Sequence, residues 1–301
     1  MYIDRLIEKI EEKGTPVICG LDPNMDLIPK TFISNLYGSK SLTVSEKAKV
    51  FLAYNQIMID EVHDLVPAIK PQIAYYEALG IEGMKCLTET IKYAKAKNLL
   101  VILDAKRNDI GSTSEAYANA FLSSNDTNDF EVDCMTIIPY MGYDSMGPFF
   151  NACFKNKKGV FVCVKTSNPG SADIQNLKCE NGKRVYEIIA EMVNEESKKH
   201  IGKYGYSNIG AVVGATFPEE AMSLRKVMPN SFFLVPGLGS QGGDMKMVRS
   251  FFNEDGKGAV INFSRAMMYP DHEENQIGKS IRTNAKRIIN DVRDTLKVKS
   301  F

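Results

Sequence analysis

Eight short apolar runs recur along the chain, and a polar or amphipathic stretch separates each run from the next. The runs span residues 16–22, 65–70, 99–106, 134–140, 159–166, 208–216, 232–237 and 258–265. Their apolar residues are continuous rather than alternating, which is typical of parallel strands buried on both faces. The stretches between them show helical spacing, as in Val50, Tyr54, Ile57 and Met58. This pattern, without a linker, predicts one α/β domain over residues 1–301, a closed (β/α)8 TIM barrel; an open doubly wound sheet is the alternative.

Charge and segment composition argue against several classes of partner. Lysine plus arginine equals aspartate plus glutamate, at 37 each, so bulk charge would not steer nucleic acid or an anionic membrane to the protein. The longest purely aliphatic run is about five residues, against the roughly 20 needed to span a bilayer. The first residues, MYIDRLIEKIEEKG, predict a short amphipathic helix rather than a secretory signal. The six cysteines are scattered without CxxC spacing, so we expect a cytoplasmic protein with reduced thiols.

Charged or polar residues end most of the apolar runs. In a barrel, the carboxyl ends of the strands meet at one mouth, where barrel enzymes keep their active sites. Asp104 and Lys106 lie two positions apart and are expected on one side of their strand, with Asp109 in the following loop or first helical turn. A solvated ion pair, worth about 0–1 kcal/mol, is the alternative. The recurrence of such residues on other strands favours a functional site; they are Asp22, Lys70, Asp104, Lys106, Lys165, Ser167, Ser264 and Arg265.

Two features after the last two runs predict a phosphate site. The segment VPGLGSQGGD (235–244) carries glycines that let backbone N–H groups approach an anion, and Gln241 adds an amide donor. Arg265 follows the eighth run and offers a planar donor fork suited to phosphate. Loops seven and eight are the usual phosphate site of barrel enzymes. A tight turn and a solvated arginine beside a helix cap are the alternative interpretations.

Two connections are longer than the others, residues 23–44 after the first run and residues 165–181 after the fifth. Both would lie at the mouth, and the second fits a mobile lid or a tolerated surface insertion equally well. His63, His200 and His272 lie far apart, with no second ligand at metal spacing. We therefore expect no metal site.

The stretch DAKRNDIGST (104–113) resembles the DxKxxDIxxT signature of the orotidine 5'-phosphate decarboxylases. Further matches to that family are ICGLDPN, AIKPQIAYYE, KTSNPG, PGLGSQGGD and NFSRAM, in order along nearly the whole chain. AIKPQ and LDAKRNDIGST are similar to the longer bacterial subclass. The resemblance implies a barrel that converts orotidine 5'-phosphate to uridine 5'-phosphate (UMP) and CO2 in pyrimidine biosynthesis, with no cofactor and no metal.

The resemblance also implies roles for individual residues. Lys70, Asp104, Lys106 and Asp109 would form an alternating Lys-Asp-Lys-Asp array, in which Lys106 protonates C6 of the pyrimidine. A homodimer is implied, with Asp109 and Thr113 contributed across the interface to the partner subunit's site. The implied substrate contacts are Asp22 and Lys70 for the ribose hydroxyls, Ser167 for the pyrimidine edge, and Gln241 and Arg265 for the phosphate.

Two other functions fit parts of the pattern. A hexulose-phosphate synthase is a related phosphate-binding barrel enzyme that shares the DxKxxD frame, but it binds Mg²⁺ and acts on sugar phosphates. A catalytically silent nucleotide-binding protein is the other alternative, although all four charged positions of the array are filled.

Overall fold

The eight predicted strands form a closed, all-parallel barrel in which each strand pairs with the next and β1 pairs with β8. The computed structural model describes residues 1–124, 128–216, 218–238, 245–271 and 276–296. The predicted barrel is confirmed, and the open sheet is wrong. The strands are β1 Val17–Leu21, β2 Ala68–Pro71, β3 Leu100–Arg107, β4 Cys134–Ile137, β5 Gly159–Lys165, β6 Ser207–Val213, β7 Ser231–Val235 and β8 Ala259–Phe263.

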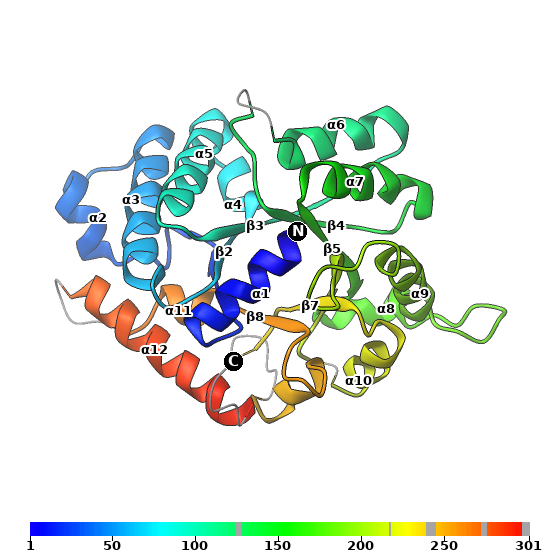
Figure 1. Ribbon diagram of the computed structural model, residues 1–301. Coiled ribbons are helices and arrows are strands. Elements are labelled where there is room, and N and C mark those ends of the chain that lie inside the picture. The colour runs from blue at the N-terminus through cyan, green and yellow to red at the C-terminus, as the bar shows by residue number, and fades with distance from the viewer. Residues whose placement is uncertain (125–127, 217, 239–244, 272–275, 297–301) are drawn as a thin grey trace.

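Helices surround the barrel and connect its strands (Figure 1). None of the described helices is long and apolar enough to cross a membrane. The α-helices are α1 Tyr2–Lys13, α2 Lys30–Tyr37, α3 Val44–Val62, α4 Ile73–Glu77, α5 Gly80–Ala96, α6 Gly111–Leu122, α7 Tyr143–Asn156, α8 Ala172–Gln175, α9 Val185–Ser197, α10 Pro218–Val227, α11 Arg265–Met268 and α12 Ile277–Leu296, with 3-10 helices η1 Pro169–Ser171 and η2 Met245–Phe251.

The strands bury both of their faces, in two separate apolar clusters. Along β3, Val101 and Leu103 pack outward against the helices, whereas Leu100 and Ile102 point into the barrel interior. The amphipathic helix α1 lies across the amino ends of the strands (Figure 1), and its buried residues, Leu6 among them, join the interior cluster. One end of the barrel is therefore closed, and side chains at the carboxyl ends are left to form a cavity.

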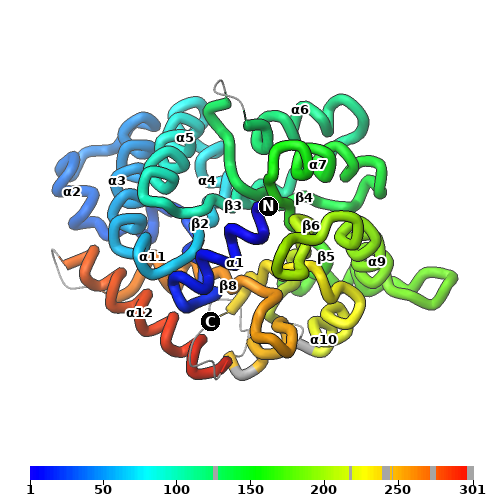
Figure 2. Tube along the Cα trace, in the orientation of Figure 1, coloured from blue at the N-terminus to red at the C-terminus, as the bar shows by residue number. Residues whose placement is uncertain are grey.

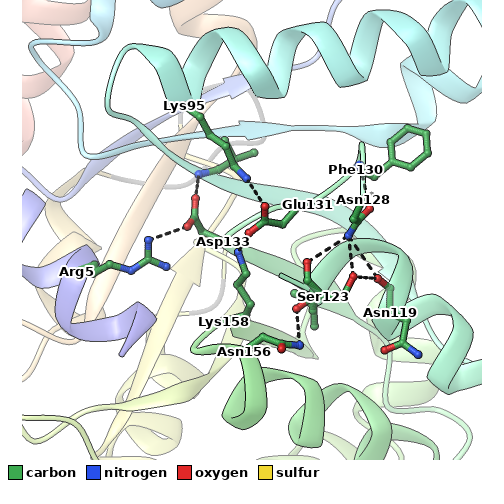
Figure 3. A network of polar contacts seen from close by, with 12 residues as sticks. Arg5, Lys95, Asn119, Ser123, Asn128, Phe130, Glu131, Asp133, Asn156 and Lys158 are labelled. Atoms are coloured by element: carbon green, nitrogen blue, oxygen red, sulfur yellow. Dashed lines mark hydrogen bonds and ion pairs between the residues drawn. The ribbon is translucent and has the colours of Figure 1, made fainter. Parts of the chain in front are cut away.

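A network of charged side chains ties α1 to the barrel (Figure 3). Arg5 of α1 binds Asp133, which directly precedes β4, at 2.9 Å. The other carboxylate oxygen of Asp133 accepts a hydrogen bond from the backbone N–H of Val101 at 3.0 Å. Glu131 pairs with Lys95 at 3.4 Å and also with Lys158. The Arg5–Asp133 ion pair thus ties α1 to the start of β4, and the Glu131 pairs tie the residues before β4 to α5 and to the start of β5.

The two long connections contain secondary structure of their own. Residues 23–44 include α2, and residues 165–181 include η1 and α8. The Gln175 amide returns to the end of β5, where it accepts from the N–H of Thr166 at 3.0 Å and donates to its hydroxyl at 2.8 Å. Between α8 and α9 the chain projects from the side of the barrel (Figure 2). The half of the segment nearest β5 is thus held against the strand end.

Candidate active site

A cavity of about 530 Å³ opens at the carboxyl ends of the strands. Its volume lies in the range of small-molecule sites. The strand order brings together side chains that lie up to 247 residues apart in sequence, because successive strand ends meet at one mouth. Six of the nine predicted site residues line this cavity; they are Asp22, Lys70, Asp104, Lys106, Ser167 and Arg265.

Lys70, Asp104 and Lys106 form a continuous chain of ion pairs in the cavity wall. The Lys70 ammonium contacts one carboxylate oxygen of Asp104 at 2.8 Å, and the Lys106 ammonium contacts the other at 2.6 Å. The Lys70 side chain is 4% exposed, whereas the Lys106 side chain is 45% exposed. Lys106 is therefore the more accessible of the two lysine side chains.

The charges of the array depend on one another. Burial alone raises the pKa of Asp104, but the ammonium groups of Lys70 and Lys106 outweigh it and hold that pKa well below its usual range. Burial likewise lowers the pKa of Lys70, but the carboxylates of Asp104 and Asp22 outweigh that effect and the net change is upward. Both side chains are consequently charged at neutral pH.

Lys106 reaches Asp104 through an irregular backbone. Leu103 pairs with Met135 and Arg107 pairs with Ile137, so three residues of β3 lie opposite a single residue of β4. Lys106 has φ +48°, in the left-handed region that L-residues seldom adopt. The predicted meeting of Asp104 and Lys106 is confirmed, but the regular strand alternation from which we predicted it does not hold at Lys106.

Asp22 is held at the mouth by an aromatic side chain that the sequence did not reveal. The Tyr269 hydroxyl donates to the backbone carbonyl of Asp22 at 3.0 Å and accepts from the N–H of Asn24 at 2.8 Å. Its ring stacks on Tyr54 with centroids 5.8 Å apart. The Oδ1 atom of Asp22 is buried and has no hydrogen-bond partner among the described residues. A polar group of a bound molecule could satisfy that oxygen.

Ser167 approaches the cavity because a glycine lies beneath it. A Cβ atom on Gly214, just after β6, would stand 2.7 Å from the Ser167 backbone. The Gly214 N–H donates to the Lys165 carbonyl at 2.8 Å, and the Thr216 hydroxyl donates to the Ser167 carbonyl at 3.2 Å. Any larger residue at position 214 would push the Ser167 loop away from the mouth.

The predicted phosphate residues are described only in part. Arg265 is the first residue of α11, and its exposed side chain lines the cavity. Gly237 and Leu238, at the start of the glycine-rich segment, line the same wall. Gln241 lies outside the residues that the structure describes. A cationic donor therefore stands at the mouth, where β8 ends.

Asp109 and Thr113 do not line the cavity of their own chain. The Asp109 carboxylate accepts from the N–H of Ile110 at 2.8 Å, and Thr113 is exposed on α6. Ile110, next to Asp109, is 60% exposed, and Tyr140, in the loop after β4, is 81% exposed. The predicted four-residue array is thus a three-residue array within one chain.

Sequence reasoning missed two polar residues of the strands themselves. Thr136 of β4 and Asn262 of β8 are buried and line the cavity. Each interrupts an apolar run, a signal that could have identified both. In the described part of the chain, no three His, Cys, Asp or Glu side chains gather in a group that could hold a metal ion.

The described geometry combines an acidic and basic array with a separate cationic donor. An ammonium near a reacting atom can donate a proton or stabilise developing negative charge. An arginine at the mouth can bind an anionic group remote from that atom. The cavity therefore suits an anionic substrate on which proton transfer occurs.

Comparison with known proteins agrees with this geometry. The model of the orotidine 5'-phosphate decarboxylase / HUMPS family matches residues 48–276. A relative named orotidine 5'-phosphate decarboxylase, from Caldicellulosiruptor bescii, is 42% identical over 273 residues, 89% of each chain. Another relative of that name, from Clostridium botulinum, is 40% identical over 299 residues, 99% of this chain and 100% of the relative.

A solved structure extends the comparison to the fold. The Leishmania donovani OMP decarboxylase has a TM-score of 0.76 with this chain and 30% sequence identity, over 99% of both chains. Lys70, Asp104, Lys106 and Arg265 all fall within the residues that the family model matches. On these grounds, the chain belongs to the orotidine 5'-phosphate decarboxylase / HUMPS family.

Proposed function

We propose that this protein decarboxylates orotidine 5'-phosphate to UMP and CO2, in pyrimidine biosynthesis, without a cofactor or a metal. The observation that carries the proposal is the chain of ion pairs Lys70, Asp104 and Lys106 in a cavity that Arg265 also lines. Relatives that match nearly the full chain bear the name of that enzyme. The five buried free cysteines suit a reducing cytoplasm.

The chemical step needs a proton donor and stabilisation of negative charge. The bond between C6 and the carboxyl carbon breaks, CO2 leaves, and the electron pair stays on C6. The Lys106 ammonium stabilises that charge and gives its proton to C6; the neutral amine then regains a proton from water. Asp104 orients the Lys106 ammonium, since their atoms are 2.6 Å apart. An anionic Asp104 near the substrate carboxylate would also oppose the ground state.

The remaining residues would bind the parts of the substrate that do not react. Asp22, with its unpartnered buried oxygen, and the buried Lys70 would hold the ribose hydroxyls. Ser167 would contact the pyrimidine edge, and Arg265 with Gln241 would bind the phosphate. Remote binding energy of this kind can be used to orient the reacting end.

We further propose that the active protein is a homodimer. Asp109 and Thr113 would enter the partner subunit's cavity and complete its array. The exposed apolar residues beside them support this arrangement, because a patch of this kind marks an interaction surface. They are Ile110, Ile138, Tyr140 and Met141.

The test is a spectrophotometric assay of the purified full chain with orotidine 5'-phosphate. We expect turnover that survives EDTA, together with a rise in melting temperature on adding UMP. A Lys106→Ala variant should lose turnover but keep the UMP-induced shift, because UMP binds through the groups that do not react. Turnover only of sugar phosphates, restored by Mg²⁺ after EDTA, would point instead to a hexulose-phosphate synthase. A UMP shift without any turnover would support a silent nucleotide-binding protein.

A further inference from the structure

The hydroxyl of Thr136 lies at the irregular point of the barrel wall. Thr136 is the third residue of β4, is 1% exposed and lines the cavity. Its Oγ1 accepts from the backbone N–H of Ala105 at 3.0 Å and from that of Lys106 at 2.9 Å. It also donates to Oδ1 of Asp104 at 2.9 Å. Three consecutive residues of β3 therefore converge on one side-chain oxygen.

These contacts use the whole hydrogen-bonding capacity of the hydroxyl. A threonine hydroxyl has one proton and two lone pairs. The two amides occupy the lone pairs, so the proton can only point to Asp104. That carboxylate oxygen also receives the Lys106 ammonium. Thr136 thus fixes the orientation of the carboxylate that in turn holds Lys106.

The same contacts explain the backbone of Lys106. Successive N–H groups point in opposite directions in a regular strand, so two neighbouring amides cannot share one acceptor without a bulge. The strand supplies the bulge by placing three residues opposite Thr136 and by giving Lys106 its φ of +48°. Without the hydroxyl, the buried amide of Ala105 and the partly buried amide of Lys106 would lose their acceptor, and Lys106 could relax to an extended conformation.

We propose that Thr136 is a positioning residue, whose hydroxyl aims the Lys106 ammonium into the cavity by fixing both the Lys106 backbone and the Asp104 carboxylate. This inference rests on the proposed function, in which Lys106 transfers the proton. The Lys70 contact uses the other oxygen of Asp104 and does not depend on Thr136. Loss of the hydroxyl should therefore disturb the proton-donating side of the array and leave the binding side in place.

The test compares Thr136→Val, which keeps the shape, with Thr136→Ser, which keeps the hydroxyl. We expect Thr136→Val to lower kcat by about 10²-fold, the effect of a displacement near 1 Å in a catalytic group. KM for orotidine 5'-phosphate and Kd for UMP should stay within about threefold, since the phosphate and ribose contacts are intact. Thr136→Ser should recover most of the kcat.

Thr15 provides the matched control. It is fully buried at the closed end of the barrel, where its hydroxyl accepts from the N–H of Val17 at 3.2 Å. Thr15→Val should lower the melting temperature without changing kcat. Should Thr136→Val fail to fold, Thr136→Cys keeps the volume with a weaker acceptor, and its kcat should fall between those of the wild type and Lys106→Ala.

Two results would overturn the inference. The first is a Thr136→Val enzyme with wild-type kcat, or one whose loss is confined to KM. The second is a crystal structure of Thr136→Val in which Lys106 keeps both its positive φ and its contact with Asp104. The structural result decides the matter even if the wild type proves inactive on orotidine 5'-phosphate, so failure of the positioning role is distinguishable from failure of the proposed function.

Discussion

At the scale of single residues, Asp104 is the side chain that the other polar residues of the array contact. One of its oxygens receives Lys70, and the other receives both Lys106 and the Thr136 hydroxyl. Two cations and one anion leave the described array with a net positive charge. An anionic substrate would therefore be attracted, and a second carboxylate such as Asp109 of a partner could be accommodated beside Lys106.

The shifted pKa values predict how stability depends on pH. The pKa of Asp104 is lowered in the fold, so its contribution is present above the ordinary carboxyl value, about 3.9, and is lost as the pH falls through the folded value. Asp104→Asn lacks this contribution. We expect the melting-temperature difference between wild type and variant to shrink as the pH falls from 5 to about 2.5. A difference that stays constant or widens over that range would contradict the assignment.

The proposed phosphate contact predicts the effect of removing Arg265. Hydrogen bonds to charged groups contribute about 1.5–3 kcal/mol each, and each 1.4 kcal/mol is tenfold in rate. Arg265→Ala should therefore lower kcat/KM by about 10²-fold or more. With the wild-type enzyme, added phosphite should partly restore the turnover of a substrate that lacks the phosphate. Steady-state kinetics measure both effects. Arg287 is an exposed arginine on α12 that pairs with Asp291. Arg287→Ala is therefore the control, and it should leave kcat/KM unchanged. An unchanged kcat/KM in Arg265→Ala would remove the phosphate assignment.

Sequence reasoning identified the charged residues of the cavity but not the residue that orients them. Lys70, Asp104 and Lys106 were predictable because each ends an apolar run, and strand ends in a barrel converge. Thr136 contacts them only because the β3–β4 register is irregular, and no pattern in a single sequence encodes a register. The proposed entry of Asp109 and Thr113 into a partner's cavity would involve a second chain, and a single sequence does not show how two chains meet.

At the scale of elements, the bounds of an apolar run in the sequence did not mark the bounds of a strand. The run at residues 65–70 begins before β2 because Leu65 and Val66 close the end of α3, each donating its N–H to the Val62 carbonyl. The run at residues 134–140 continues beyond β4 into Ile138 and Tyr140, which are exposed. A buried turn and an exposed apolar surface therefore look the same as a strand in the sequence.

A substitution in the buried face of helix α1 should lower the stability of the protein without lowering its activity. Leu6 is fully buried in the interior cluster, at the end of the barrel opposite the cavity. Leu6→Ala should lower the free energy of unfolding by about 2–5 kcal/mol because it leaves a cavity in a packed core. Urea unfolding measures the loss, and kcat at 25 °C should be unchanged. Leu36→Ala on α2, where the side chain is 47% exposed, is the control and should hardly change the free energy of unfolding. A lower kcat in Leu6→Ala would show that α1 influences the cavity.

The whole molecule should act as a dimer with composite cavities. Mixing two inactive proteins, Lys106→Ala and Asp109→Ala, would place an intact Lys106 beside a partner's intact Asp109 in one cavity of each mixed dimer. Random reassortment makes half the dimers mixed, so about a quarter of wild-type activity should return. Activity is measured after exchange, and co-purification of differently tagged subunits verifies that exchange occurred. No recovery in an exchanged sample would contradict the composite site.

The sequence favoured a closed barrel over an open sheet, but it could not establish that the barrel closes. Continuous apolar strands alternating with helices occur in open sheets as well as in barrels. The deciding contact is between β1 and β8, where Val17 pairs with Ile261. That contact joins residues 244 positions apart, and no local pattern reports it.

The joining of distant segments has a consequence for synthesis on the ribosome. The apolar face of α1 packs against an interior to which β8 contributes Val260, and Arg293 of α12 donates to the carbonyls of Lys13 and Gly14 at 3.0 and 2.7 Å. Helix α1 therefore lacks its partner on α12 until 280 residues beyond Lys13 have been made. Part of its apolar face stays uncovered until β8 has been made, and the described fold is complete only after α12 has been made.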